Sequence, residues 1–277
     1  MGELLEPAVE GQHSQRVALC IEYNGSSFNG WQSQKSQDVA TVQETLESAL
    51  TKVADHSVKL TCAGRTDTGV HGIGQVVHFD FDNPRPEKAW VRGGNSHLPE
   101  SVSVRWARQV PLDFHARFSA TARRYRYIIY NNDVRPALLS RLVTPYYLPL
   151  DEAAMHEAGQ QLLGENDFTS FRGATCQSST PMRNVQTLSV TRQGDFVIMD
   201  IQANAFLLHM VRNIAGTLME IGEGLKPVSW AGEVLEMKDR TQAGVTALPD
   251  GLYLAGVVYP DEFDLPASPE GPVILGC

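Results

Sequence analysis

The chain has 277 residues, of which 42% are hydrophobic and 20% charged, a composition typical of a folded globular protein and too apolar for disorder. At about 100–200 residues per domain, this length favours two domains or one large domain. The formal net charge of −9 argues at first against a nucleic-acid partner, and no apolar run approaches the roughly 18–20 residues that a membrane span requires. The first fifteen residues are acidic and polar, which excludes a secretory signal or a transit peptide, so we expect a cytoplasmic protein.

The first part of the chain predicts a β-α-β-β order, with strands at residues 17–23, 58–62 and 75–81 and a helix at residues 41–54. The helix begins with a capping box, because Glu44 follows Thr41 at the required spacing. A glycine-rich stretch separates the last two strands. Beyond them, residues 83–111 are polar, contain proline and carry no predicted element.

The second part mixes strands and helices again, with strands at 125–130, 188–191, 196–203 and 252–259 and helices at 151–163, 206–221 and 230–237. Asp151 is placed to cap the first of these helices, and Gly194 marks the turn of a hairpin. Gly216, inside the helix at 206–221, costs about 1 kcal/mol relative to alanine, so we expect another segment to approach closely there. Strands interleaved with a few helices predict two α+β halves, each a sheet covered on one face.

Charge is distributed unevenly along the chain. Between Arg105 and Arg141 there are eight arginines, no lysine and only two acids, Asp113 and Asp133, so this segment has a net charge of +6 on an otherwise acidic protein. A basic segment on an acidic body can bind one polyanion at one place and discourage binding elsewhere. The alternative is a set of unrelated surface ion pairs.

The run GRTDTGVHG at residues 64–72 has the strongest functional signal. Its glycines allow tight turns and close approach of a ligand, and Asp67 lies between them. In extended backbone Arg65 would face the same way as Asp67, and such a cation would keep the carboxylate ionised, as a nucleophile must be. The alternative is an aspartate of an Asx turn in a surface loop.

Asp67-Thr68-Gly69 also spells the triplet of aspartic proteases. That chemistry requires two carboxylates that share one proton, and the sequence has no second such triplet, although a homodimer would supply one. Arg65 argues further against it, because an adjacent cation favours two ionised carboxylates. We therefore set the protease hypothesis well below the nucleophile hypothesis.

Aromatic residues alternate with cations in two places, FHARF at 114–118 and RRYRY at 123–127. Arginine can pair with phosphate, and aromatic rings can stack on unpaired bases. In a strand, Tyr125 and Tyr127 share one face and Arg124 shares the other with Arg126. One face could then hold a base, or the tyrosines could simply belong to the core while the arginines are solvated.

A metal or redox centre is not expected from the remaining candidates. The cysteines are far apart, with no C-x-x-C pair, and the eight histidines show no ligand spacing, so we interpret His71 and His78 as ordinary residues. Arg212 lies beside His209 and Gly216 on its helix, off the apolar stripe, where a solvated arginine is the usual explanation.

Six motifs together are similar to those of the TruA family of bacterial tRNA pseudouridine synthases, across nearly the whole chain. They are YNGSSFNGWQ at 23–32, GRTDTGVHG at 64–72, FHARFSATARRYRY at 114–127, DFTSF at 167–171, HMVRNIAG at 209–216 and DRTQAGVTALPDGLY at 239–253. The resemblance implies the pseudouridine synthase fold: two ferredoxin-like α+β halves that share a mixed, mainly antiparallel sheet, with helices on one face and a central cleft. The implied domains are residues 16–112 and 113–262, with tails at 1–15 and 263–277.

The resemblance also implies a function, the isomerisation of uridine to pseudouridine at positions 38, 39 and 40 in the anticodon stem-loop of tRNA, by a homodimer without cofactor or metal. The implied catalytic residues are Asp67 as the nucleophile, Tyr125 on the uracil, Arg212 beside the carboxylate and Leu252 closing the pocket; whether Asp67 attacks C6 or C1′ stays open. Arg65 matches the arginine linked to base extrusion. The implied substrate-binding residues are Arg65, Phe114, His115, Arg117, Phe118, Arg123, Arg124 and Tyr125. The alternative from another class is a non-catalytic RNA-binding module, since ferredoxin-like halves with aromatic strands bind RNA.

Overall fold

The computed structural model describes residues 15–33, 39–272 and 274, so the expected N-terminal tail lies outside them except for its last residue, while most of the expected C-terminal tail lies within them. Its strands are β1 (Gln15–Tyr23), β2 (Thr61–Cys62), β3 (His71–Phe81), β4 (Val102–Val110), β5 (Ala122–Asn131), β6 (Thr144–Tyr146), β7 (Gly164–Asp167), β8 (Met182–Gln193), β9 (Phe196–Ala203) and β10 (Leu252–Val258). Its α-helices are α1 (Val42–Ala54), α2 (Glu87–His97), α3 (Glu152–Gln160), α4 (Met210–Gly222) and α5 (Trp230–Met237).

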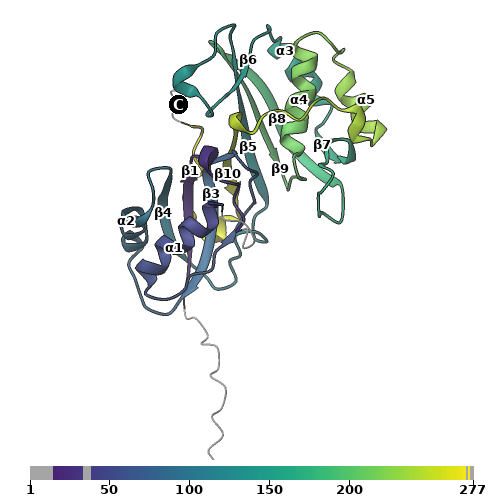
Figure 1. Ribbon diagram of the computed structural model, residues 1–277. Helices are drawn as coiled ribbons and strands as arrows, with labels where there is room; N and C mark the ends of the chain where they lie inside the picture. The colour runs from purple at the N-terminus through teal and green to yellow at the C-terminus, as the bar shows by residue number, and fades with distance from the viewer. Residues whose placement is uncertain (1–14, 34–38, 273, 275–277) are drawn as a thin grey trace, which may run out of the picture.

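All ten of these strands belong to one open sheet in the order β4-β1-β3-β10-β5-β9-β8-β7, with β2 beside β3 and β6 beside β5 (Figure 1). Most neighbours are antiparallel, and β10 pairs parallel to β3 but antiparallel to β5. The last strand in the chain therefore joins the first half, β1 to β4, to the second half, β5 to β9. The predicted α+β class with a mixed, mainly antiparallel sheet is confirmed.

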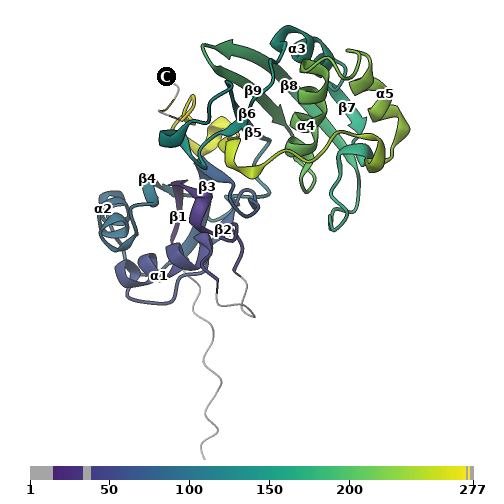
Figure 2. The same cartoon turned by 45° about the horizontal axis from the view of Figure 1, so that its top comes forward.

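The helices cover one face of this sheet. In Figure 1 and Figure 2, α1 and α2 lie beside β1 and β4, while α3, α4 and α5 lie beside β7 to β9. Gly72 of β3 pairs with Tyr23 on one side and with Leu254 on the other, and paired residues point to the same face. Tyr23 belongs to the core under α1 and α2, and Leu254 to the core under α3 and α4, so both cores lie on that face.

The segment 83–111, which carries no predicted element, contains α2 and β4. The helix follows Pro86 without a side-chain cap and includes two glycines, so its local signal is weak. Tertiary contacts stabilise it instead. Trp90 is 1% exposed, with its ring 5.1 Å from Phe79 and 5.2 Å from Phe81, and Asn95 bonds both backbone groups of Val104.

Local signals elsewhere are confirmed. Thr41 caps α1 by accepting a hydrogen bond from the Glu44 N–H, and Asp151 caps α3. Gly194 turns the β8–β9 hairpin with a φ of +57°. The helix predicted at 206–221 begins only at Met210, because His209 has a φ of 59°, outside the right-handed helical region.

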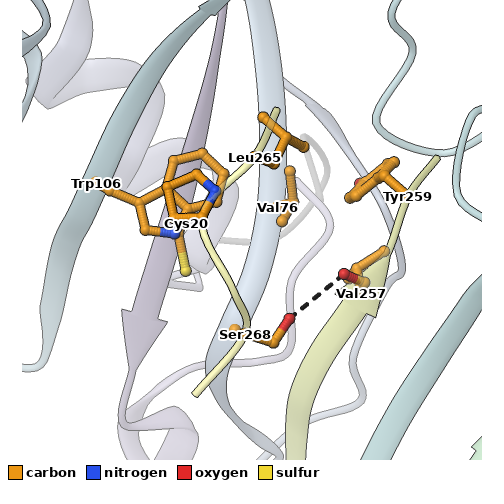
Figure 3. Close-up of a pocket in the computed structure, with 9 residues that line it drawn as sticks. Cys20, Val76, Trp106, Val257, Tyr259, Leu265 and Ser268 are labelled. Carbon is orange, nitrogen blue, oxygen red and sulfur yellow. Dashed lines mark hydrogen bonds between the residues drawn. The ribbon is translucent and has the colours of Figure 1, made fainter. Parts of the chain in front are cut away.

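Part of the other face of the sheet is covered by the chain after β10. Figure 3 shows Leu265 and Ser268 of this segment beside Val257, Tyr259 and Trp106. The hydroxyl of Ser268 donates a hydrogen bond to the Val257 carbonyl at 3.4 Å. The cavity left between them has a volume of only about 10 Å³, which is too small for a ligand.

Candidate active site

A cleft of about 1030 Å³ opens on the helix-covered side, where the two halves meet. It is lined by the loop before β3, by β5 and by the chain that leads into α4, together with residues 175–178 and Leu252. Among the described lining residues Asp67 is the only acid, and the cations are Arg65, Arg117, Arg123, Arg183, Arg212 and, when protonated, His209. A protein with a net charge of −9 thus has a strongly cationic cleft around one carboxylate.

The loop that carries Asp67, residues 63–70, is fixed from both sides. The Thr66 hydroxyl and the Tyr23 hydroxyl form a hydrogen bond of 2.9 Å, and the Thr66 carbonyl accepts one from the Trp31 N–H at 3.0 Å. Gly30 makes this approach possible: its φ is +81°, and a Cβ there would lie 2.8 Å from the Thr66 carbonyl oxygen. The motif at 23–32 therefore supports the loop, and the Asp67 side chain remains 28% exposed toward the cleft.

His71, at the end of this loop, joins three distant segments. Its Nδ1 accepts from the Gly25 N–H at 3.0 Å, so Nε2 carries the proton and faces the carbonyls of Arg141 and Asp250 at 2.9 and 3.1 Å. Burial lowers the pKa of His71 and keeps the ring neutral. His71 therefore has a structural role: it connects the Asp67 loop to Gly25 and to the segments that contain Arg141 and Asp250.

The Asp67 carboxylate has two partners at the start of α4. Nη1 of Arg212 and Nε2 of His209 each lie 3.5 Å from Oδ2 of Asp67. The Arg212 side chain is 15% exposed, and its Nε donates to the Ala247 carbonyl at 2.7 Å. Arg65 is exposed at the cleft and makes no ion pair with another described residue. Arg212, which is distant from Asp67 in the sequence, is thus the arginine that lies at ion-pair distance from the Asp67 carboxylate.

Tyr125 and Leu252 form an apolar wall opposite these charges. Tyr125 is 8% exposed, and its ring meets that of Phe206 edge to face at 5.0 Å. Burial and the charge of Asp67 raise the pKa of the Tyr125 hydroxyl above its usual range, so it stays protonated. A Cβ added to Gly64 would lie 3.8 Å from this hydroxyl, which places the ring beside the Asp67 loop.

The predicted substrate-binding residues divide into two groups. Arg117, Phe118 and Arg123 line the cleft, and Phe118 is 74% exposed with the Arg117 guanidinium 5.5 Å from its ring centre. The His115 ring packs on Phe118 at 4.3 Å. Phe114, however, is fully buried against aromatic rings of the C-terminal segment.

Arg124 is also away from the cleft, on the opposite face of β5. Its guanidinium forms two hydrogen bonds of 2.6 and 2.7 Å with the Asp200 carboxylate, which Arg126 shares. Arg105, Arg108 and Arg141 have acidic partners as well. For these arginines of the basic segment the surface ion-pair alternative is correct.

Arg123 lines the cleft, but its guanidinium is bonded to the backbone. Its guanidinium donates to four backbone carbonyls, those of Ala63, Arg117, Ala120 and Asn204. Arg123 therefore connects the Asp67 loop, at Ala63, to the rim of the cleft, at Arg117. Its positive charge is not paired with a carboxylate of the described residues. Arg183, which sequence patterns did not single out, is similar: it bonds the carbonyls of Thr180 and Met182 and supports residues 175–178 at the cleft.

A single carboxylate held by arginine in a cleft between two α+β halves agrees with the family comparison. The family model described as tRNA pseudouridine synthase matches residues 19–119 and 158–260, and the chain belongs to this family. It is 58% identical over 260 residues to tRNA pseudouridine synthase A of Shigella boydii, covering 94% of this chain and 96% of that protein. The same name belongs to relatives from Aliivibrio salmonicida and Pseudoalteromonas atlantica, 58% and 55% identical, each covering 94% of this chain and 98% of the relative.

Among solved structures, one titled as a Cbf5-Nop10-Gar1 complex aligns with 86% of this chain and 48% of its own, at 12% identity and a TM-score of 0.35, too weak a likeness to bear on the fold. Within residues 15–33, 39–272 and 274, no helix is long and apolar enough to cross a membrane. In the same residues no three histidine, cysteine or acidic side chains are grouped so that they could hold a metal ion.

Proposed function

We propose that this protein isomerises uridine to pseudouridine in tRNA, at positions 38, 39 and 40 of the anticodon stem-loop. In this reaction the N1–C1′ bond breaks, the uracil turns, C5 bonds to C1′, and the proton lost from C5 is balanced by one gained at N1. Reactant and product are isomers, so the reaction requires no oxidant, reductant or energy source. Family membership and relatives with this name over 94% of the chain support the proposal.

The observation that carries it is Asp67, the one acid among the described residues of an arginine-lined cleft. Arg212 holds this carboxylate in place at 3.5 Å, and a carboxylate held in this way can act as a nucleophile. A uridine in a stem is stacked, so it must be everted before its C6 or C1′ reaches Asp67. The exposed Arg65 at the same cleft is placed to meet the nucleotide during this movement.

The neighbours of Asp67 have separate roles in the proposal. Arg212, and His209 when protonated, orient the carboxylate and hold its charge at 3.5 Å. Tyr125 and Leu252 offer the flat apolar surface on which a uracil can stack. Because the Tyr125 hydroxyl stays protonated, it acts on the base as a hydrogen-bond donor.

The RNA backbone would be bound by the cations of the cleft that form no ion pair with an acid of the described residues. Arg117 and Phe118 at the rim supply a phosphate ligand and a stacking surface, and Arg123 and Arg183 add positive potential from behind. We include a homodimer in the proposal, because a groove shared by two chains needs few arginines from each. A tRNA substrate also fits a cytoplasmic location.

The direct test is incubation of the protein with unmodified tRNA, followed by site-mapped detection of pseudouridine. Wild type should convert uridines at positions 38, 39 and 40, and Asp67→Asn should bind the tRNA and convert none. A non-catalytic RNA-binding module would give no pseudouridine with either protein. Conversion only outside the anticodon stem-loop would refute the proposed sites.

A further inference from the structure

The chain between α5 and β10 crosses α4 in close contact, and Figure 1 shows this crossing. Residues 243–247, which we call the crossing segment, follow the helix for about two turns. The Val245 carbonyl lies against Gly216, where a Cβ would be only 1.8 Å from the oxygen, and the Gly244 N–H donates to the Thr217 hydroxyl at 3.0 Å. Gly216 is therefore the close approach that the sequence predicts.

The crossing segment ends at Arg212. The Ala247 N–H donates to the Arg212 carbonyl at 3.1 Å, and the Ala247 carbonyl accepts from Nε of the same arginine at 2.7 Å. One residue thus binds both the backbone and the side chain of Arg212. Because an arginine guanidinium is planar, fixing Nε leaves Nη1 directed at Asp67.

The residues next to this pair form a second link. Asn213, fully buried, accepts at Oδ1 from the Thr246 hydroxyl at 2.7 Å and from Arg240 at 3.0 Å. Its Nδ2 donates to the Phe171 carbonyl at 2.8 Å. The Thr246 hydroxyl in turn accepts from Arg240 at 2.8 Å. The Asn213 amide and the Thr246 hydroxyl are thus both bonded to groups of the protein, and neither lines the cleft that contains Asp67.

We propose that Thr246 and Asn213 are positioning residues for the reaction. They hold the Ala247 carbonyl against Nε of Arg212, which fixes the guanidinium toward the Asp67 carboxylate. A small displacement of an oriented group can cost much of the rate, so a hydroxyl away from the substrate can control turnover. This inference rests on the proposed function, in which Arg212 acts through Asp67.

The test compares Thr246→Val with Thr241→Val. Both changes remove one threonine hydroxyl from the chain between α5 and β10, but Thr241 is exposed, and its hydroxyl bonds the side chains of its near neighbours Asp239 and Gln242. Thr246→Val should lower the single-turnover rate on unmodified tRNA about tenfold and leave the dissociation constant for tRNA within twofold. Thr241→Val should change neither quantity more than twofold. A Thr246→Val rate equal to that of Thr241→Val would overturn the inference.

Two further measurements separate positioning from general support of the fold. In an Arg212→Lys background, which lacks Nε, Thr246→Val should cause no further loss of rate; two independent losses that multiply would contradict the inference.

The Arg212 Nε–H, followed by ¹⁵N NMR, should exchange with water at least tenfold faster in Thr246→Val than in wild type, and unchanged exchange would overturn the inference. This NMR result does not depend on activity. If wild type modifies no tRNA, the proposed function fails, while exchange at Arg212 still decides whether the crossing segment holds this side chain.

Discussion

Nη1 of Arg212 lies 3.5 Å from Oδ2 of Asp67, although the two residues belong to different halves of the protein. Asp67 precedes β3, and Arg212 lies in the first turn of α4. The distance between them depends on β10, which pairs with β3 on one side and with β5 on the other. The candidate active site therefore exists only when the last strand has joined the two halves.

Replacing the carboxylate should separate binding from chemistry. In Asp67→Asn the cleft loses its only described acid while the side-chain shape is kept. We expect the isomerisation rate to fall by roughly 10³-fold or more and tRNA affinity at low salt to stay equal or improve, since a charge that repels phosphate is gone. Filter binding and single-turnover assays measure the two effects. A variant that bound tRNA tenfold more weakly would show that Asp67 contributes to binding.

Two arginines of the basic segment should differ in their effect on RNA binding. Arg117 is exposed at the cleft rim, whereas Arg124 is bonded to Asp200 on the opposite face. Arg117→Ala should weaken tRNA binding and reduce the slope of log K against log salt by about 1, and Arg124→Ala should leave the slope unchanged. The measurement is affinity at several salt concentrations. Equal slopes for the two variants would place the RNA footprint elsewhere.

Removing the hydroxyl of Tyr125 should impair turnover more than binding. The hydroxyl lies beside the Asp67 loop and has no hydrogen-bond partner among the described residues, so it is available to the substrate. Tyr125→Phe should lower kcat by about 10–100-fold, the loss of one hydrogen bond worth roughly 1.5–3 kcal/mol, with tRNA affinity kept by stacking. Tyr127→Phe is the control, because that hydroxyl bonds Thr144 and Leu248 outside the cleft. Full activity of Tyr125→Phe would restrict Tyr125 to stacking.

The elements that the sequence predicts well are those with a local signal. A side-chain cap marks α1 at Thr41, a glycine marks the β8–β9 turn, and the amphipathic run 230–237 matches α5. The helix α2 has no such local signal. It is stabilised by the contacts of Trp90 with two phenylalanine rings of β3. Contacts of this kind join residues that are close only after folding.

The same limit applies to the site. The motif around Asp67 identifies the loop, and Gly216 predicts a close contact without saying which segment makes it. The sequence could not reveal that Arg123 binds four carbonyls, since every residue has a carbonyl to offer. Nor does residue type distinguish Phe114, which is in the core, from Phe118, which is exposed at the cleft. A phenylalanine can belong to the core or line a binding cleft, and its place is decided by contacts that form only on folding.

Stability should depend on pH through His78. Burial, reinforced by the charge of Arg16, lowers the pKa of His78 to about 4, and the ring accepts the Ala116 N–H at Nδ1. The unfolded chain binds the proton below about 6.5 and the folded protein does not, so the free energy of unfolding falls as pH falls from about 6.5 to 4. From pH 7 to pH 5 this one group should remove about 2 kcal/mol. Urea unfolding at both values measures the loss.

The matched variants for this test are His78→Gln and His97→Gln. Glutamine can still accept the Ala116 N–H but does not titrate, so the loss between pH 7 and pH 5 should shrink by about 2 kcal/mol in His78→Gln. His97 is exposed at the end of α2, and its replacement should leave the pH dependence unchanged. A pH dependence that is the same in wild type and in both variants would assign the effect to other groups.

Two helical glycines should respond in opposite ways to alanine. At Gly216 a Cβ would lie 1.8 Å from the Val245 carbonyl oxygen, which is backbone and can move only with the crossing segment. Gly216→Ala should therefore destabilise the protein by about 2 kcal/mol or more, despite the gain of about 1 kcal/mol in helix propensity. At Gly232 the nearest atom is Oε1 of Gln161, the end of a flexible side chain, so Gly232→Ala should be neutral or stabilise by up to about 1 kcal/mol. Thermal unfolding of both variants checks the contrast, and equal stability would show that the crossing segment can leave α4 without cost.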